Sequence, residues 1–283
     1  MRWAQITIDS TEEAVDAVGQ CLSRAGCAGF AEADAGAVHQ VSGYLPVDDR
    51  LEDRLLRLKE DVGALPSHGI DGAGSDLTLT FVEEEDWANA WKQYFKPIRV
   101  GDRLVVTPPW ESPTLAGDDI PIVIDPGMAF GTGSHGTTQL CLEALERLVK
   151  PGMTVADIGT GSGILAIAAR KLGASRVNAC DIDPLAVKIA RENAAVNGVA
   201  IDVTEEMVSE PADVVVANIL ADVIIGLQDE LFALVRPGGH LIASGIIDSR
   251  AGDVRQSLEA TRFKALETTT KTEWVALVLE RPA

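Results

Sequence analysis

The sequence predicts an α/β protein whose larger part is a doubly wound, mostly parallel sheet that ends in an antiparallel strand. From Pro151 onward, strand patterns alternate with helix patterns, an order that favours a parallel sheet covered by helices on both faces. One of these strands runs through a glycine-rich turn directly into a helix, within residues 155–165. The last two strand patterns, 263–268 and 273–279, have no helix between them, so this terminal hairpin places one strand antiparallel.

The strands of this larger part are short and apolar, and its helices carry apolar residues at helical spacing. The predicted strands are 154–158, 176–181, a short strand near Ile201, 213–217 and 240–245. The predicted helices are 164–172, 184–197, 221–235 and 251–260. Ligands of doubly wound sheets bind at the carboxyl ends of the strands, so residues that directly follow these strands are the first candidates for a site.

The first part of the chain shows a different order of elements. Its patterns are a strand at 4–8, a helix at 12–25, a strand pair at 29–47, a helix at 51–65 and a strand at 76–82. This βαββαβ order is the split βαβ arrangement of ferredoxin-like domains. Because the segment has no evident catalytic constellation, we expect residues 1–84 to form a small α+β domain that recognises the substrate.

Residues 85–105 are predicted to link this domain to the larger one, residues 106–283. Three aromatic residues fall on one face of a short helix that Pro97 stops, a pattern typical of a packed linker. These residues are Trp87, Trp91 and Tyr94. The strands predicted next are 98–108 and 120–124.

The formal net charge of −19 is strongly acidic. Such a charge argues against a protein that grips bare nucleic acid through phosphate contacts. It suits a basic partner, but a net charge of this kind can also serve only to keep a protein soluble. Both interpretations stay open at this point.

The sequence predicts neither a leader peptide nor a membrane span. Residues 1–9 alternate like a strand without an apolar signal core, and no uncharged stretch is long enough to cross a bilayer. A cytoplasmic protein is therefore expected. The four cysteines form no C-x-x-C pair and have no partnering histidines, so we expect buried reduced thiols and no metal site.

The turn after the strand at 154–158 has the composition of a nucleotide-binding junction. Gly159, Gly161 and Gly163 let backbone N–H groups approach a ligand, and the helix from Ile164 adds the partial positive charge of its amino end. Dinucleotide sites use G-x-G-x-x-G, whereas the spacing here is G-x-G-x-G. This spacing resembles the first motif of the S-adenosylmethionine-dependent methyltransferases, which bind an amino acid and a ribose at this turn.

Two carboxylates follow the second strand of the larger domain. Asp181 ends that strand at the separation expected of a carboxylate that holds ribose hydroxyls. Asp183 lies directly before Pro184 and an amphipathic helix, so it is the expected N-cap of that helix. The sequence therefore favours Asp181 over Asp183 as the ribose ligand.

A second glycine-rich segment, 125–138, precedes an apolar-striped helix. Thr137 or Thr138 is the expected N-cap of that helix. A cap explains where the helix begins, but not why so long an irregular stretch lies beside a nucleotide-binding fold. Long loops in such places usually have a function.

Four segments together resemble the PrmA-type ribosomal-protein methyltransferases. They are DWANAWKQYFKPIRVGDRLVVTPPW, IDPGMAFGTGSHGTTQLCLEALE, DIGTGSGILAIAA and the tetrapeptide Asn218-Ile219-Leu220-Ala221. The GTGSHGTT loop and the tetrapeptide are much more specific than the glycine turn. The resemblance implies a class I, Rossmann-like methyltransferase fold, with S-adenosylmethionine bound by Thr138, Gly159, Asp181 and Asn218.

The resemblance also implies the substrate, which is ribosomal protein eleven of the large subunit, methylated on lysine ε-amino groups and on its N-terminal α-amino group. Asn218 is the expected catalytic residue, because an amide oxygen can accept hydrogen bonds from an attacking amine; a simple strand-end turn is the other interpretation. Related enzymes that methylate glutamine amides or adenine carry Asn/Asp-Pro-Pro-Tyr/Phe at this place, whereas this chain continues from Asn218 with Ile219-Leu220 and has no aromatic clamp for a planar amide. The alternative function is a protein-lysine or glutamine N-methyltransferase that acts on another translation-associated protein.

Three further alternatives stay open. His135 could act as a general base, although a hydrogen bond that orders the loop is favoured. A nicotinamide-dependent dehydrogenase would share the sheet, but it needs the longer glycine spacing and a hydride-transfer residue, and we find neither. A non-catalytic binding module is also compatible, because a fold does not determine a function.

Overall fold

The computed structural model describes residues 2–11, 14–27, 30–34, 39–48, 50–68, 77–83, 95–125 and 133–283. Its chain forms two compact units, Met1–Phe95 and Lys96–Ala283. The predicted linker helix with Trp87, Trp91 and Tyr94 lies outside the described residues, as do residues 126–132 of the second glycine-rich segment.

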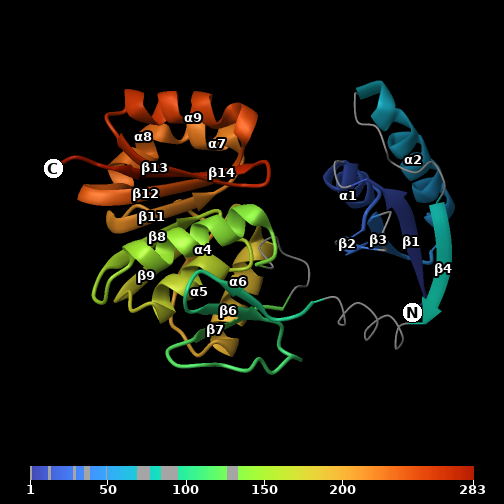
Figure 1. Ribbon diagram of the computed structural model, residues 1–283, viewed down its shortest axis with the longest axis horizontal. Coiled ribbons are helices and arrows are strands. Elements are labelled where there is room, and N and C mark those ends of the chain that lie inside the picture. Colours follow the sequence, from blue (N-terminus) through green and yellow to red (C-terminus); the bar gives the residue numbers. More distant parts are fainter. Residues whose placement is uncertain are drawn as a thin grey trace. The chain divides into compact units, whose positions relative to one another are not determined.

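The N-terminal unit is a four-stranded antiparallel sheet with two helices (Figure 1). Its strands, in the spatial order β2-β3-β1-β4, are β1 Arg2–Ser10, β2 Phe30–Asp34, β3 His39–Pro46 and β4 Leu77–Glu83. Its helical elements are α1 Val15–Arg24, α2 Leu51–Ala64 and the 3-10 turn η2 Leu65–His68. Ile6 and Ile8 of β1 are fully buried in one core with Leu22 of α1 and Leu58 of α2, so both helices cover the same face. The predicted βαββαβ order is confirmed.

The larger unit contains a seven-stranded sheet with the order β10-β9-β8-β11-β12-β14-β13. Its strands are β8 Thr154–Ile158, β9 Arg176–Cys180, β10 Asp202–Thr204, β11 Ala212–Asn218, β12 Val235–Ile247, β13 Lys264–Lys271 and β14 Trp274–Glu280. The first five strands of that order are parallel, whereas β14 runs antiparallel to both β12 and β13. The predicted mostly parallel sheet with a late reversal is therefore confirmed.

Helices cover both faces of this sheet, α4 to α6 on one face and α7 to α9 on the other (Figure 1). They are α4 Gly136–Leu148, α5 Ile164–Lys171, α6 Pro184–Val196, α7 Ala221–Gly226, α8 Gln228–Leu234 and α9 Asp248–Ala260. Strand β11 shows why, because successive side chains of a strand point to opposite faces. Val214 and Val216 lie in the core with α4 to α6, and Val215 and Ala217 lie in the core with α7 to α9.

A small three-stranded sheet precedes the large one. It consists of β5 Ile98–Val100, β6 Leu104–Thr107 and β7 Ile120–Val123. The prediction of one strand over 98–108 is wrong, because the chain turns at Gly101, where φ is 65°, and β6 pairs back antiparallel to β5. Leu104 and Ile122 are fully buried in the core shared with α4 to α6.

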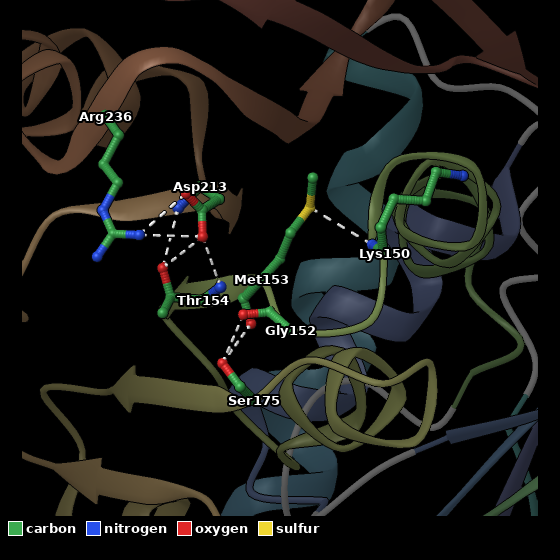
Figure 2. A network of polar contacts seen from close by, with 7 residues as sticks. All are labelled: Lys150, Gly152, Met153, Thr154, Ser175, Asp213 and Arg236. Carbon is green, nitrogen blue, oxygen red and sulfur yellow. Dashed lines mark hydrogen bonds and ion pairs between the residues drawn. The ribbon is translucent and has the colours of Figure 1, made fainter.

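A polar network holds the amino ends of β8 and β11 in register (Figure 2). The Oδ2 atom of Asp213 accepts hydrogen bonds from the backbone N–H of Thr154 at 2.7 Å and from its hydroxyl at 2.9 Å. Arg236 donates to Oδ1 of Asp213 at 3.0 Å. Burial opposes the ionisation of Asp213, but the hydrogen bonds from Thr154 and Arg236 outweigh it and lower the pKa of Asp213. With this end fixed, the opposite ends of β8 and β11 lie side by side, where Ile158 pairs with Ala217.

Two predicted elements have different bounds in the structure. The helix predicted at 221–235 is divided at Leu227 into α7 and α8, next to Gly226, and glycine is a poor helix former. The strand predicted at 240–245 is longer and spans Val235–Ile247. The cysteines are buried and unpaired, as predicted: Cys21, Cys27, Cys141 and Cys180. No helix in the described part of the chain is long and apolar enough to span a membrane.

Candidate active site

The turn between β8 and α5 has the backbone conformation that its glycines predict. The angle φ is 73° at Gly159, 54° at Gly161 and 82° at Gly163, values that residues with a side chain rarely adopt. The N–H groups of Gly159 and Thr160 both donate to the carbonyl oxygen of Cys180, at 2.9 and 3.0 Å. Helix α5 begins at Ile164, as predicted, and its amino end therefore faces the turn.

Asp181 directly follows β9 and is hydrogen-bonded to the glycine turn. Its Oδ2 accepts from the N–H of Gly161 at 2.8 Å, and its Oδ1 accepts from the N–H of Asp183 at 3.0 Å. Each carboxylate oxygen can accept a further hydrogen bond, which leaves capacity for two ligand hydroxyls.

Asp183 is the N-cap of α6, as predicted. Its Oδ1 accepts from the N–H of Leu185 at 2.9 Å, and Pro184 occupies the first helical position. Asp183 thus serves to begin α6, whereas Asp181 is the carboxylate of this pair that is hydrogen-bonded to the glycine turn.

Asn218 is the last residue of β11, beside the end of β8. Its backbone pairs with Ser244 of β12, and the preceding residue, Ala217, pairs with Ile158. The Oδ1 atom of Asn218 is buried and accepts no hydrogen bond within the described part of the chain. A buried acceptor without a partner costs about 1–3 kcal/mol, so a ligand donor here is strongly favoured.

Thr138 lies inside the first turn of α4, and its predicted capping role is wrong, as is that of Thr137. Helix α4 begins at Gly136, so His135 is the N-cap residue, and the His135 side chain makes no capping hydrogen bond within the described part of the chain. The hydroxyl of Thr137 meets Nδ1 of His135 at 2.7 Å. Thr138 is fully buried, and its Oγ1 has no hydrogen-bond partner among the described residues. This hydroxyl is therefore available to a ligand.

Asp157 of β8 is a site residue that the sequence analysis missed. Its Oδ2 accepts hydrogen bonds from the Thr160 hydroxyl at 2.7 Å and from the N–H of Ala166 at 3.1 Å. Its Oδ1 is buried and accepts none from the described residues. Burial away from water raises the pKa of Asp157 to about 7, and the hydrogen bonds from Thr160 and Ala166 oppose this rise. The signal in the sequence was a carboxylate within an apolar strand, a costly placement without a polar partner.

Gly133, in the described part of the second glycine-rich segment, lies close to the start of α5. Gly133 has a φ of 91°, and a Cβ atom there would lie 2.7 Å from Cγ1 of Val106 and 3.2 Å from Cδ1 of Ile164. One turn along α4 from Thr138, Cys141 is fully buried, and Ser244, the strand partner of Asn218, is fully buried as well. The segment before α4 and the turn before α5 therefore meet at the carboxyl ends of the strands.

Three buried oxygens that have no partner among the described residues thus lie at this end of the sheet: Thr138 Oγ1, Asp157 Oδ1 and Asn218 Oδ1. Buried polar atoms without partners are rare in folded proteins, and here they indicate a polar ligand. With the two carboxylates of Asp157 and Asp181, they fit a cofactor that has a ribose, an amino-acid group and a positive charge. S-adenosylmethionine has all three features.

His135 contacts both the first turn of α4 and the β13–β14 hairpin. Its ring is 4.9 Å from the ring of Trp274 and makes the contact to Thr137. Burial lowers the pKa of His135, and the nearby Glu273 opposes that shift. A neutral imidazole at this position helps to hold the start of α4 against the β13–β14 hairpin. Lys271 of that hairpin also donates to Oε1 of Gln139 at 2.5 Å.

The strand order, the glycine turn and the three buried oxygens that can bind a ligand define the class of protein: an S-adenosylmethionine-dependent methyltransferase. The family model described as ribosomal protein L11 methyltransferase (PrmA) matches residues 2–282. The chain belongs to this family.

Individual relatives agree with this assignment. Ribosomal protein L11 methyltransferase of Symbiobacterium thermophilum is 44% identical over 305 residues, which covers 100% of both chains. The protein of the same name from Pelotomaculum thermopropionicum is 44% identical and covers 98% of each chain. The crystal structure of ribosomal protein L11 methylase from Lactobacillus delbrueckii subsp. bulgaricus superposes with a TM-score of 0.63 at 37% identity, over 67% of this chain and 100% of that one.

Proposed function

We propose that this protein transfers methyl groups from S-adenosylmethionine to lysine ε-amino groups and to the N-terminal α-amino group of ribosomal protein L11. The observation that carries the proposal is the buried Oδ1 of Asn218 beside the glycine turn, which accepts no hydrogen bond from any residue that the structure describes. An oxygen at this place can accept hydrogen bonds from an amine while the amine faces a cofactor held by the turn.

The chain's own residues would hold the cofactor through complementary polar contacts. Asp181 would accept hydrogen bonds from ribose hydroxyls, and the Thr138 hydroxyl and the Gly159 backbone would contact the rest of the cofactor. When bound, S-adenosylmethionine supplies an activated methyl group on a positively charged sulfur. The buried carboxyl of Asp157 favours a cation nearby, because an ionised carboxylate in a low-dielectric interior gains from an opposite charge.

Asn218 would align the acceptor amine, and alignment is the main contribution that such a transfer needs from the protein. A lysine amine has an ordinary pKa near ~10.4 and must lose its proton before it can attack, whereas an α-amino group near ~8 does so more readily. The residues that follow Asn218, Ile219-Leu220-Ala221, include no ring on which a planar amide could stack. This favours an amine over a glutamine amide as the acceptor.

The N-terminal region, residues 1–84, is proposed to recognise the substrate, and residues 85–105 to join it to the methyltransferase domain, 106–283. The net charge of −19 supports a basic partner such as a lysine-rich ribosomal protein. Since ribosomal proteins are made and assembled in the cytoplasm of bacteria, we place this protein in that compartment.

The test is transfer of a labelled methyl group from S-adenosylmethionine to purified ribosomal protein L11, followed by mass spectrometry of its peptides. Label on lysines and on the N-terminus is expected, and L11 with acetylated amines is the matched control. Label in another protein of a total ribosomal fraction, with none in L11, would establish the alternative substrate. Cofactor binding without transfer to any protein would indicate a binding module.

A further inference from the structure

We infer that Ile219 is a positioning residue that sets the spacing between Asn218 and the glycine turn. The inference rests on the proposed function, in which Asn218 orients the acceptor amine. Ile219 lies between two glycines that belong to different parts of the site, Gly159 in the turn and Gly245 in β12.

On one side, the side chain of Ile219 occupies the space beside Gly159. A Cβ atom on Gly159 would lie 2.3 Å from Cγ2 of Ile219, far closer than the ~3.5–4.0 Å of a normal carbon contact. Gly159 also has a left-handed φ of 73°. The γ-methyl group of Ile219 therefore rests on the backbone of the turn that is assigned to the cofactor.

On the other side, the backbone of Ile219 is held against β12. Its N–H donates to the carbonyl oxygen of Ser244 at 3.1 Å. A Cβ atom on Gly245 would lie 2.4 Å from the carbonyl oxygen of Ile219 and 2.9 Å from its carbonyl carbon. These are backbone atoms, which cannot rotate away as a side chain can. The residue after Asn218 is thus fixed to the sheet from which Asn218 projects.

The two contacts connect the acceptor side of the site to the donor side. Sheet pairing fixes the strands as far as Asn218, and the turn begins one residue beyond β8. Beyond the ends of these strands, the contact of the Ile219 γ-methyl with Gly159 keeps the turn at a fixed distance from Asn218. A displacement of ~1 Å in a reacting group can cost ~10²-fold in rate, so a spacer at this point controls turnover.

A purely structural role makes a different prediction. Ile219 is partly buried against the core of α7 to α9, so its truncation lowers stability in either case. Only a positioning role also lowers the turnover of the molecules that remain folded while leaving cofactor affinity nearly intact. Turnover, cofactor affinity and melting temperature must therefore be measured together.

The first experiment compares Ile219→Ala with Ile219→Val in the full-length protein. Valine keeps a branched side chain at Cβ, whereas alanine removes every γ-carbon. For Ile219→Ala we expect kcat with L11 to fall at least tenfold and the calorimetric Kd for S-adenosylmethionine to change less than threefold. Ile219→Val should recover most of the turnover. If kcat, corrected for the folded fraction, is unchanged in Ile219→Ala, the inference is wrong.

The second experiment adds a methyl group to the glycine turn, on the other side of the contact between Gly159 and Ile219. Gly159→Ala should weaken cofactor binding and turnover, because its Cβ displaces Ile219. Gly159→Ala combined with Ile219→Ala should recover at least fivefold in cofactor affinity over Gly159→Ala alone. Gly238→Ala is the matched control, since Gly238 has a similar φ of 78° and open space around it.

Two results of this second experiment contradict the spacer. One is a double variant that binds no better than Gly159→Ala, and the other is a Gly238→Ala variant that is equally impaired. Wild-type protein that binds the cofactor but does not methylate L11 refutes the proposed function instead. The recovery of cofactor affinity then still decides whether Ile219 presses on the turn.

Discussion

Replacing Asp157 with asparagine should remove a pH dependence from the stability of the ligand-free protein. Burial raises the pKa of Asp157 from an ordinary 3.8 to about 7 in the folded protein. Between these two values the folded state holds a proton that the unfolded chain has released. The contribution of Asp157 to stability is therefore complete below the unfolded pKa and is lost as the pH rises through the folded pKa.

The size of this effect follows from the pKa difference. About 3 pKa units correspond to about 4 kcal/mol, of which about 3 kcal/mol is lost between pH 5 and pH 8. Asparagine carries no charge, and its amide oxygen can still accept the hydrogen bonds from Thr160 and Ala166. Asp157→Asn should therefore gain about 3 kcal/mol relative to the wild type over this range.

The assay is urea unfolding of both proteins, without cofactor, at unit steps from pH 5 to pH 8. Asp213→Asn is the control, because the pKa of Asp213 is lowered and its contribution is lost only as the pH falls below this range. If the stabilities of the wild type and Asp157→Asn change in parallel with pH, Asp157 does not bind a proton in the folded protein over this range.

Four further predictions concern binding and recognition. Asp181→Ala should weaken the binding of S-adenosylmethionine at least tenfold by calorimetry, since each lost charge-assisted hydrogen bond is worth about 1.5–3 kcal/mol. If Asp181→Ala leaves the Kd unchanged and Asp183→Ala raises it, the ribose ligand is Asp183 instead. Asn218→Ala should lower kcat far more than cofactor affinity, and the reverse pattern in titration and kinetics would make Asn218 a cofactor residue alone. Residues 96–283 by themselves should bind the cofactor but methylate L11 very poorly, so full activity of this fragment would refute a recognition role for the N-terminal unit. Association with L11 in stopped flow should slow as salt rises and the Debye length shrinks from ~30 Å at 0.01 M to ~10 Å at 0.1 M, whereas a flat rate would assign the charge to solubility alone.

The parts of the site that the sequence predicted are those determined by neighbouring residues. The glycine turn, the start of α5 at Ile164 and the capping role of Asp183 each depend on a few consecutive residues, and the structure confirms all three. The terminal hairpin was predictable for the same reason, because no helix separates β13 from β14.

The parts that the sequence did not predict depend on contacts between distant segments. The orphaned oxygen of Asp157 follows from burial under α5, and the place of Ile219 follows from Gly159 and Gly245, which are far from it along the chain. The predicted start of α4 was wrong because threonine is one of the residue types preferred at the N-cap of a helix. In the structure Thr138 lies within the first turn of α4, after the N-cap His135, where its hydroxyl has no partner among the described residues.

The position of β14 between β12 and β13 has a consequence for how the protein matures. Strand β12 has no neighbour on that side until β14 has been synthesised and inserted. Trp274 and Lys271 of the same hairpin contact His135 and Gln139, at the start of the helix that bears Thr138. A nascent chain that ends before Trp274 therefore has the glycine turn but lacks the support for α4. The start of α4 gains these contacts only when the last two strands of the chain have been made and have joined the sheet.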